Sequence, residues 1–529
     1  MPPVVPPTRR SRNGCIDCRR AKVKCDEIRP SCGTCARRRL VCQGYRQQPP
    51  AHSRSPAASS GSSSGSSNIT SVANNALTKT QSTYKSPAAG VASPTGTPPA
   101  RRHPAPAPDT RIFSLIPPGT VAPADEPHFE VYFNRHPFEL LIGPEFVSEM
   151  NANVLLMLQR DPATVADAVS AVGYSYLVGD SAGSLLPVLN RRARILANLR
   201  TMKQSSYYFE EALFLLLGLC AMELVTLAAP GHHATIPTVL SNVASLISHH
   251  VSTGGDVSSV ARYYLRALAR QDLVVSLVQL RRPRVPTYVW METGIPKPDR
   301  LLGYTVTMMP LLEELCILAE EVRDQILFPG QQQPVLGTGL LLEGNESGQQ
   351  PPAADDAPPL CVDGWLDPGY SSLAMRAVSL RTRLESWRPA IADGLPFRSS
   401  RKFRAQASCY RAGALLYLHR LFHPPGGTED DGEALGRAHD VMLYATGGPP
   451  DETKLLLWPV VLAACEMADP EDRAAALDVL DSIGSHRKTV TVERTRRFVE
   501  ERVWRARDAG EEWNWMVLAE AYPGECLPI

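Results

Sequence analysis

From about residue 113 to the end of the chain, apolar residues recur three and four positions apart. The run Val260, Ala261, Tyr264, Leu265 and Leu268 illustrates this spacing. A period of 3.6 residues places such positions on one face of an α-helix, and strand-like alternation is scarce in this region. Proline and glycine residues divide the segments. The pattern predicts an all-α domain of roughly ten to thirteen helices without a substantial sheet. About 400 residues of this kind can bury a large core.

The most apolar segment covers residues 212–222. A helix that crosses a bilayer needs ~18–20 apolar residues, so this segment is too short. It also has acidic residues at both ends, namely Glu210, Glu211 and Glu223. The sequence therefore predicts a helix buried inside a bundle and no association with a membrane.

Residues 47–110 consist largely of Pro, Ser, Ala, Gly and Thr, with a Ser/Gly run at 59–67. They contain too few apolar residues to bury a core, so we expect a disordered linker. No heptad pattern of apolar a and d positions continues there over three or four repeats. A zipper dimer is therefore not expected, whereas monomeric binding and a homodimer through the C-terminal domain both stay open.

A second biased segment interrupts the helical region at about residues 330–368. Residues 337–368 contain six acidic residues and no basic ones, together with scattered Leu, Val and Trp365. Mixtures of acidic and apolar residues act as activation segments that dock on coactivators. The alternative is an inserted loop that is simply solvated.

Six cysteines near the N-terminus form two copies of the spacing C-x2-C-x6-C, the second copy 17 residues after the first. They are Cys15, Cys18, Cys25, Cys32, Cys35 and Cys42. Three disulfides would be an alternative use of these residues. Residues 1–14, however, carry prolines and arginines with no apolar run, so we expect no secretory signal. Clustered cysteines in a chain that is not secreted favour a metal site.

Sites made only of thiolates suit zinc. Six thiolates can give four ligands to each of two zinc ions only if two cysteines bridge both ions. The symmetry of the two copies favours one bridging cysteine from each. Such a centre leaves no position for a catalytic water, so its predicted role is structural. A segment of about 40 residues cannot bury a sufficient core alone, and metal binding is expected to supply its folding energy.

The charge of the chain is divided unevenly. Residues 1–46 contain twelve Lys and Arg against three Asp and Glu, while the remainder contains 43 basic and 51 acidic residues. A basic segment of this density is typical of binding to DNA phosphates. A nuclear import signal alone is the simpler alternative, and Arg9, Arg10 and Arg12 are candidates for it.

Residues 12–46 resemble the zinc binuclear cluster of fungal transcription factors. The resemblance rests on all six cysteines, on the basic run Arg19-Arg20-Ala21-Lys22-Val23-Lys24, and on Pro30 in the connecting loop. It implies two zinc ions bridged by Cys15 and Cys32. It also implies two short helices related by a pseudo-twofold axis, each starting at a C-x2-C.

The same resemblance implies which residues contact double-stranded DNA. A lysine near the end of the first helix reads base edges of a CGG-type triplet, and Lys22 matches it, with Lys24 close by; lysine can donate to guanine O6 and N7. Ala21 stands where many relatives have a second basic residue, which puts one contact in doubt. The remaining basic residues are expected to line the groove or hold phosphates: Arg19, Arg20, Arg37, Arg38 and Arg39.

Most of residues 112–515 resemble the helical regulatory domain that follows the cluster in many of these factors. The clearest segment runs from Leu456-Leu457-Trp458-Pro459 through Cys465-Glu466 to Asp472-Arg473. Two other segments, Arg262 to Pro283 and Tyr410 to Arg420, occur in the matching order. The resemblance implies a domain that controls activity or recruits coactivators or corepressors.

Few residues outside the cluster suggest chemistry. The pairs His232-His233 and His249-His250 are not surrounded by a metalloprotease, catalytic-triad or phosphate-loop pattern, and we expect surface or helix-capping histidines. The other six cysteines are scattered singly and are expected to be ordinary thiols. No nucleophile with an adjacent base can be argued, so the sequence does not predict an enzyme.

These observations divide the chain into four parts. We expect a disordered basic N-terminus (1–11), a DNA-binding zinc cluster (12–46), a disordered linker (47–110) and an all-helical regulatory domain (111–529). Together they predict a nuclear, zinc-dependent, sequence-specific regulator of transcription. The resemblance to the family implies control of a metabolic pathway or a biosynthetic gene cluster. The alternative is a helical scaffold or small-molecule sensor in which the cluster is only a nonspecific nucleic-acid anchor.

Overall fold

The most apolar segment of the chain forms the buried helix α7 (Phe209–Thr226), as its sequence predicts. Fourteen of its eighteen residues are buried, including Glu211 and Glu223. The Glu223 carboxylate accepts a hydrogen bond of 2.7 Å from the Thr235 amide and lies 3.5 Å from Arg192. Buried acids are tolerated when they are paired in this way. In the described part of the chain, no helix combines the length and apolarity needed to cross a membrane.

The structure is a computed structural model. It describes residues 15–20, 25–26, 32–38, 42, 113–141, 143–180, 184–202, 208–226, 235–292, 294, 297–327, 368–391, 394–447, 453–487 and 489–529. The expected basic N-terminus, the linker and nearly all of the acidic segment at 330–368 lie outside these residues. The chain divides into two units, residues 1–100 and 101–529.

The smaller unit contains α1 (Ile16–Arg20) and α2 (Gly33–Arg37). The long helices of the larger unit are α3 (Glu126–Leu140), α4 (Val147–Arg160), α5 (Pro162–Asp180), α6 (Leu186–Met202), α7, α8 (Ile236–Ser252), α9 (Ser259–Val278), α11 (Met309–Val322), α12 (Pro368–Ser386), α13 (Phe397–Phe422), α14 (Thr428–Thr446), α15 (Leu457–Glu466), α16 (Pro470–His486) and α17 (Val490–Phe498). Its short helices are α10 (Thr287–Trp290), α18 (Arg505–Ala509) and α19 (Trp515–Ala521).

The described residues of the larger unit thus form seventeen α-helices, more than the ten to thirteen expected. The difference comes mainly from short pieces. Helices α10 and α19 have only four and seven residues, too few to show a clear apolar period. A π-helical turn, η9 (Val499–Trp504), also divides one continuous helical run into α17 and α18. No strand occurs among the described residues, in agreement with the predicted all-α class.

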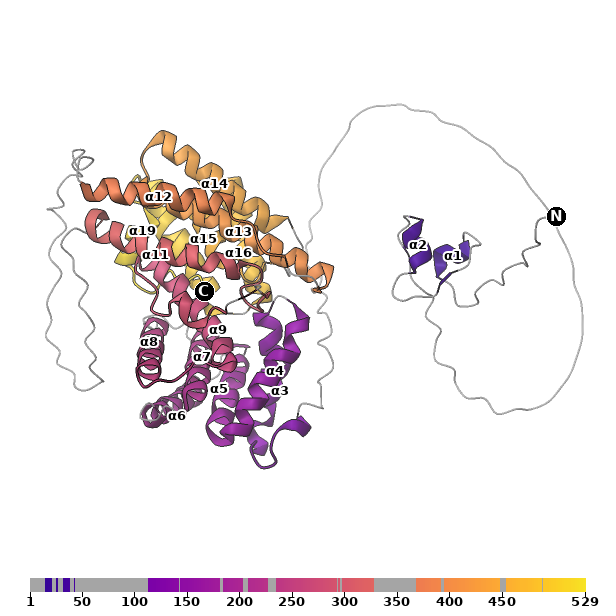
Figure 1. Ribbon diagram of the computed structural model, residues 1–529. Coiled ribbons are helices and arrows are strands. Elements are labelled where there is room, and N and C mark those ends of the chain that lie inside the picture. The colour runs from indigo at the N-terminus through magenta and orange to yellow at the C-terminus, as the bar shows by residue number, and fades with distance from the viewer. Residues whose placement is uncertain are drawn as a thin grey trace, which may run out of the picture. The chain divides into compact units, whose positions relative to one another are not determined.

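The larger unit is built from two groups of helices (Figure 1). In the first group α5 packs against α3, α4, α6 and α7, and α7 packs against α8 and α9. In the second group α13, α14 and α15 pack against one another, and α16 lies beside α15. Helix α11 contacts both α9 and α13, and α17 contacts α7, so the groups share one continuous hydrophobic core.

Helix α9 lies at the centre of this core. It begins at Ser258, whose hydroxyl accepts a hydrogen bond from the Ala261 amide, as expected of an N-cap. Sixteen of its twenty residues are buried. One of them, Asp272, is fully buried and forms a 2.9 Å ion pair with Arg281. It also accepts a hydrogen bond from the Val285 amide, which fixes the chain after the helix.

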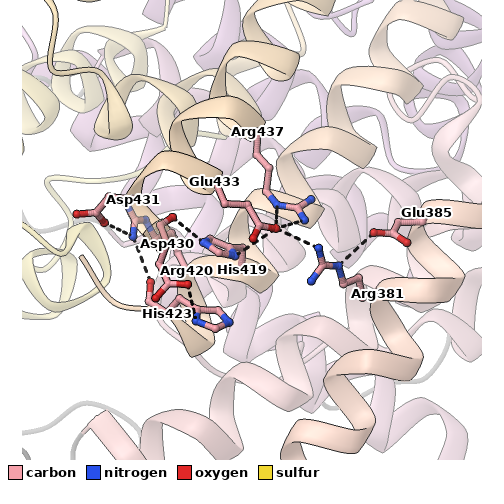
Figure 2. A network of polar contacts seen from close by, with 9 residues as sticks. All are labelled: Arg381, Glu385, His419, Arg420, His423, Asp430, Asp431, Glu433 and Arg437. Carbon is pink, nitrogen blue, oxygen red and sulfur yellow. Dashed lines mark hydrogen bonds and ion pairs between the residues drawn. The ribbon is translucent and has the colours of Figure 1, made fainter. Parts of the chain in front are cut away.

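Ion pairs connect α12, α13 and α14 at one side of the second group (Figure 2). Glu433 of α14 lies 3.0 Å from Arg381 of α12 and also pairs with Arg437 one turn away. Deeper in the structure, Arg420 of α13 pairs with Asp431 of α14 at 2.7 Å. The outer pairs are substantially exposed and contribute little to stability, whereas the Arg420 side chain is only 1% exposed.

Candidate metal centre

Each half of the cysteine cluster starts a short helix in the same way. Cys15 precedes α1 and Cys32 precedes α2. The Cys15 sulfur accepts a hydrogen bond of 3.4 Å from the Cys18 amide, and the Cys32 sulfur accepts one of 3.3 Å from the Cys35 amide. The sulfur therefore occupies the position of an N-cap acceptor. The two helices contact each other, which brings the two C-x2-C pairs together.

The spacing of the sulfur atoms fits metal coordination. The Sγ atom of Cys15 lies 3.5 Å from that of Cys32 and 3.7 Å from that of Cys35. The Sγ atom of Cys18 lies 3.5 Å from that of Cys32. These separations exceed the ~2.05 Å of a disulfide. Zinc–sulfur bonds of about 2.3 Å in a tetrahedron place neighbouring sulfurs about 3.8 Å apart. The cluster has metal-site geometry, and all six cysteines are free thiols.

The six cysteines form two overlapping groups of four, and within each group the sulfurs lie within 4.8 Å of one another. One group holds Cys15, Cys18, Cys25 and Cys32; the other holds Cys15, Cys32, Cys35 and Cys42. The groups share one cysteine from each half of the cluster. Six residues thereby offer eight ligand positions, which is the number that two tetrahedral ions require.

The environment of the sulfurs also suits a cation. Five of the six cysteines are buried, and Cys42 is half-buried. Without a bound cation, burial and then hydrogen bonds with Cys32 and Cys15 raise the pKa of the Cys35 thiol to about 12. A bound divalent cation reverses this because it stabilises the thiolate form. The site thus favours protons or a metal ion over free thiolates.

Asp26, which directly follows Cys25, is part of the cluster although sequence reasoning missed it. Its Oδ1 atom accepts a hydrogen bond of 3.1 Å from the Gly33 amide, and its Oδ2 atom accepts one of 3.4 Å from the Thr34 hydroxyl. Arg37 lies 3.7 Å from the same carboxylate. Asp26 therefore links the first half of the cluster to the start of α2. An acid seven residues ahead of a glycine carries no local signal for this contact.

We expect Asp26→Ala to lower the stability of the zinc-bound cluster by about 1 kcal/mol, because it removes a side-chain cap from α2. In a chelator competition with the full-length protein, zinc should be lost at about fivefold lower chelator concentration. Asp26→Asn is the matched control, because it keeps a carbonyl oxygen for the Gly33 amide. It should lose zinc at a chelator concentration between those of the parent protein and Asp26→Ala. Equal zinc retention in all three would show that this contact contributes nothing.

The predicted DNA-contact residues are only partly described. Arg20 ends α1, Arg37 ends α2, Arg38 follows it, and all three are exposed. Arg37 also donates a hydrogen bond of 3.4 Å to the Thr34 hydroxyl. Arg19 lies within α1. The other three predicted contacts, Lys22, Lys24 and Arg39, fall outside the described residues.

Away from the cluster, the described residues contain no second group of three or more potential metal ligands. Of the remaining cysteines, five are buried: Cys220, Cys316, Cys409, Cys465 and Cys526. Cys361 and the pair His232-His233 lie outside the described residues. His249 is exposed as expected, but His250 is not a surface residue. Its ring stacks on Phe209 with centroids 3.8 Å apart, and its Nε2 atom lies 3.1 Å from the Asp256 carbonyl oxygen, because α8 packs on α7.

Two domain descriptions match the chain. The "Fungal Zn(2)-Cys(6) binuclear cluster domain" matches residues 13–52. The "Fungal specific transcription factor domain" matches residues 154–522, which is more than half of the chain. No solved structure matches the chain.

Individual relatives match this chain over short segments of about 40 to 58 residues. The Aspercryptin biosynthesis cluster-specific transcription regulator atnN of Emericella nidulans is 50% identical over 58 residues, which is 10% of this chain and 10% of that protein. Sterol uptake control protein 2 of Candida albicans is 52% identical over 40 residues, 8% of this chain and 6% of that protein. The transcriptional regulatory protein moc3 of Schizosaccharomyces pombe is 45% identical over 40 residues, 8% of each chain. The matched segments thus span a tenth or less of these relatives.

Proposed function

Because this chain belongs to the fungal-specific transcription factors with a Zn(2)-Cys(6) binuclear cluster, we propose that it is a nuclear regulator that recognises CGG-type triplets. The family accounts for DNA binding and transcriptional regulation. The observation that carries the finer proposal is the cluster itself, with exposed arginines at the ends of both helices it organises. A compact, rigid, basic module of this kind positions side chains on phosphates and in the major groove.

The metal of this centre is zinc, with two ions per chain. Cys15 and Cys32 belong to both groups of four and are the proposed bridging ligands. The other four cysteines each bind one ion. With every position filled by sulfur, the ions hold the fold and supply no reactive water. Residues 12–46 then provide a folded module only when zinc is bound.

In the DNA-bound module, Lys22 contacts guanine edges and Arg38 contacts phosphates. Lys24, Arg19, Arg20, Arg37 and Arg39 surround these two and add to the positive surface. Support comes from the position of Arg38 directly after α2, where its side chain is exposed, and from the surplus of basic residues in this segment. Base contacts determine specificity, whereas phosphate contacts determine affinity for any sequence.

If Lys22 contacts bases and Arg38 contacts phosphates, replacing each by alanine should affect DNA binding differently. Lys22→Ala should cost about 1–3 kcal/mol on a CGG duplex and flatten the discrimination against a scrambled duplex. Arg38→Ala should weaken binding to both duplexes alike and lower the slope of log K against log salt by about one. Titrations of the full-length zinc-loaded protein at two salt concentrations measure both effects.

Lys297→Ala, an exposed lysine of the other unit, is the control and should leave both titrations unchanged. A chelator should abolish the triplet preference of the parent protein. If the parent protein binds CGG and scrambled duplexes equally, the cluster is a nonspecific anchor. Full discrimination in Lys22→Ala would instead assign base reading to another residue.

The helical unit is the proposed controlling part, which recruits coactivators or corepressors and provides any dimer contact. Regulation of a biosynthetic gene cluster is the proposed biological role. It is supported by the similarity of a 58-residue segment of the chain to a regulator named for such a cluster. Expression profiling after deletion of the gene that encodes this chain tests the role. The transcript levels of genes that lie together in one cluster should then fall in a coordinated way.

A further inference from the structure

A cavity lies within the helical unit among α3, α4, α5, α7 and α9. Sites for small organic molecules are typically concave and mostly apolar, with a few precisely placed polar groups. Much of the wall of this cavity is apolar or aromatic. The rings that line it belong to Tyr132, Tyr176, Phe214, Tyr263 and Tyr264.

Three arginines also line this cavity, namely Arg270, Arg300 and Arg487. They are 5%, 4% and 2% exposed, respectively. No aspartate or glutamate is among the residues that line the cavity. Arginine is rarely buried without an acidic partner, because removing its charge from water is costly. The residues that line the cavity therefore include three buried positive charges and no negative one.

Several polar atoms of this wall lack hydrogen-bond partners. They include Nε and Nη1 of Arg487, Nη1 of Arg300, Oε1 of Gln271 and the hydroxyl of Tyr263. The Asp299 carboxylate lies 3.8 Å from Arg300 Nη1, which is too far for a hydrogen bond. Buried polar groups are normally satisfied, so unsatisfied atoms gathered in one cavity indicate a missing partner.

Two of the three arginines, Arg300 and Arg270, are held in place by contacts with neighbouring tyrosines. The Arg300 guanidinium lies 3.5 Å from the centroid of the Tyr263 ring and donates a hydrogen bond of 3.0 Å to the Tyr263 carbonyl. Arg270 donates a hydrogen bond of 3.4 Å to the Tyr410 hydroxyl. The Arg300 contacts leave its Nη1 atom without a hydrogen-bond partner, and preorganised donors lower the entropic cost of binding a ligand.

Local electrostatics also favour an anion. Burial, followed by the nearby charge of Arg270, lowers the pKa of Arg487 to about 10, so the side chain is still charged at neutral pH. Burial also lowers the pKa of His136 to about 3 and keeps this ring neutral. The charge of Glu139 acts in the opposite direction and raises the pKa of Arg487, but Glu139 is itself paired with Arg135. A carboxylate in the cavity would relieve the repulsion between the arginines.

We propose that this cavity binds an organic carboxylate with a mostly apolar body, as an effector site of the helical unit. The carboxylate accepts hydrogen bonds from the unpartnered nitrogens of Arg487 and Arg300, since the planar guanidinium matches its geometry. The body packs against the aromatic wall, and a hydroxyl on it would satisfy Gln271. The inference goes beyond the proposed function and does not depend on DNA recognition, because the cavity lies within the helical unit.

The first test compares acids with their neutral amides. Full-length zinc-loaded protein is titrated by calorimetry with 2-naphthoate and 2-naphthamide, and with decanoate and decanamide. At least one acid should bind tenfold or more tightly than its amide. Arg487→Gln should reduce this preference to less than twofold, whereas Arg505→Gln, an exposed arginine of α18, should retain it. Absence of any acid preference in the parent protein, or its survival in Arg487→Gln, would overturn the proposal.

The second test measures the thermal stability of the protein without a ligand. Arg487→Met removes a buried charge that has no hydrogen-bonded acid, so it should raise the Tm of the ligand-free protein by about 2 °C or more. The acid that binds should then no longer stabilise the variant. A lower Tm in Arg487→Met would show that this arginine serves the fold. Acid binding should persist in Cys15→Ser, which separates failure of this site from failure of the zinc cluster.

Discussion

Replacing Cys15 by serine should remove both zinc ions and abolish DNA binding. Its sulfur belongs to both groups of four, 3.5 Å from that of Cys32, so its loss leaves each ion with an incomplete set. Binding of structural zinc contributes about 10–16 kcal/mol, and a segment this small has no core that could compensate. Elemental analysis of the purified full-length protein should give close to two zinc ions per chain for the parent protein and close to none for the variant.

Cys18→Ser provides the matched comparison, because Cys18 belongs to only one of the two groups. This variant should retain more zinc than Cys15→Ser, with one group still complete. Cys526→Ala, a buried cysteine of the helical unit, should keep both ions. If Cys15→Ser and Cys18→Ser lose zinc equally, or Cys15→Ser keeps two ions, the assignment of Cys15 as a bridging ligand is wrong.

The second large effect is expected at a buried ion pair of the helical unit. Glu466 ends α15 and is 1% exposed, as is Arg420 of α13. The Arg420 guanidinium donates two hydrogen bonds to the Glu466 carboxylate, Nε to Oε1 at 3.0 Å and Nη2 to Oε2 at 2.6 Å. Glu466→Gln removes the negative charge and leaves the guanidinium without its main partner. It should lower the free energy of unfolding by about 3–5 kcal/mol.

Urea denaturation followed by circular dichroism measures this loss. Glu433→Gln serves as the control, because this glutamate also pairs with arginines but is 43% exposed, and it should cost less than about 1 kcal/mol. Replacing both Arg420 and Glu466 by apolar residues of similar size should recover part of the loss, since no deeply buried charge remains unpaired and Asp431, the other partner of Arg420, is 26% exposed. Similar costs for Glu466→Gln and Glu433→Gln would contradict the importance assigned to the buried pair.

The sequence by itself determined the features that depend on short spacings. The repeated C-x2-C-x6-C pattern predicted the metal centre, because ligands three and seven positions apart can converge within a short segment. Apolar periodicity predicted the all-α class, and the acidic residues at the ends of 212–222 predicted a buried helix rather than a membrane span. Each of these properties is set by neighbours along the chain.

The tertiary structure alone decided which distant residues meet. Periodicity shows that a helix has a buried face, but it does not show which helix covers that face. Arg420 and Glu466 are 46 positions apart and pair only because α13 packs on α15. His250 was expected at the surface or as a helix cap. It lies in the last turn of α8 but is buried, because α8 packs on α7.

The same reason explains why neither Asp26 nor Arg487 could be recognised from the sequence. Asp26 acts through the α2 amide seven residues later, and this contact exists only once the two halves of the cluster have come together. Arg487 looks like an ordinary surface arginine at the end of α16. Its burial beside Arg270, more than 200 positions earlier, follows from the way the helices close around the cavity. The partners of a charged side chain are determined by tertiary packing, so they cannot be read from its position in the sequence.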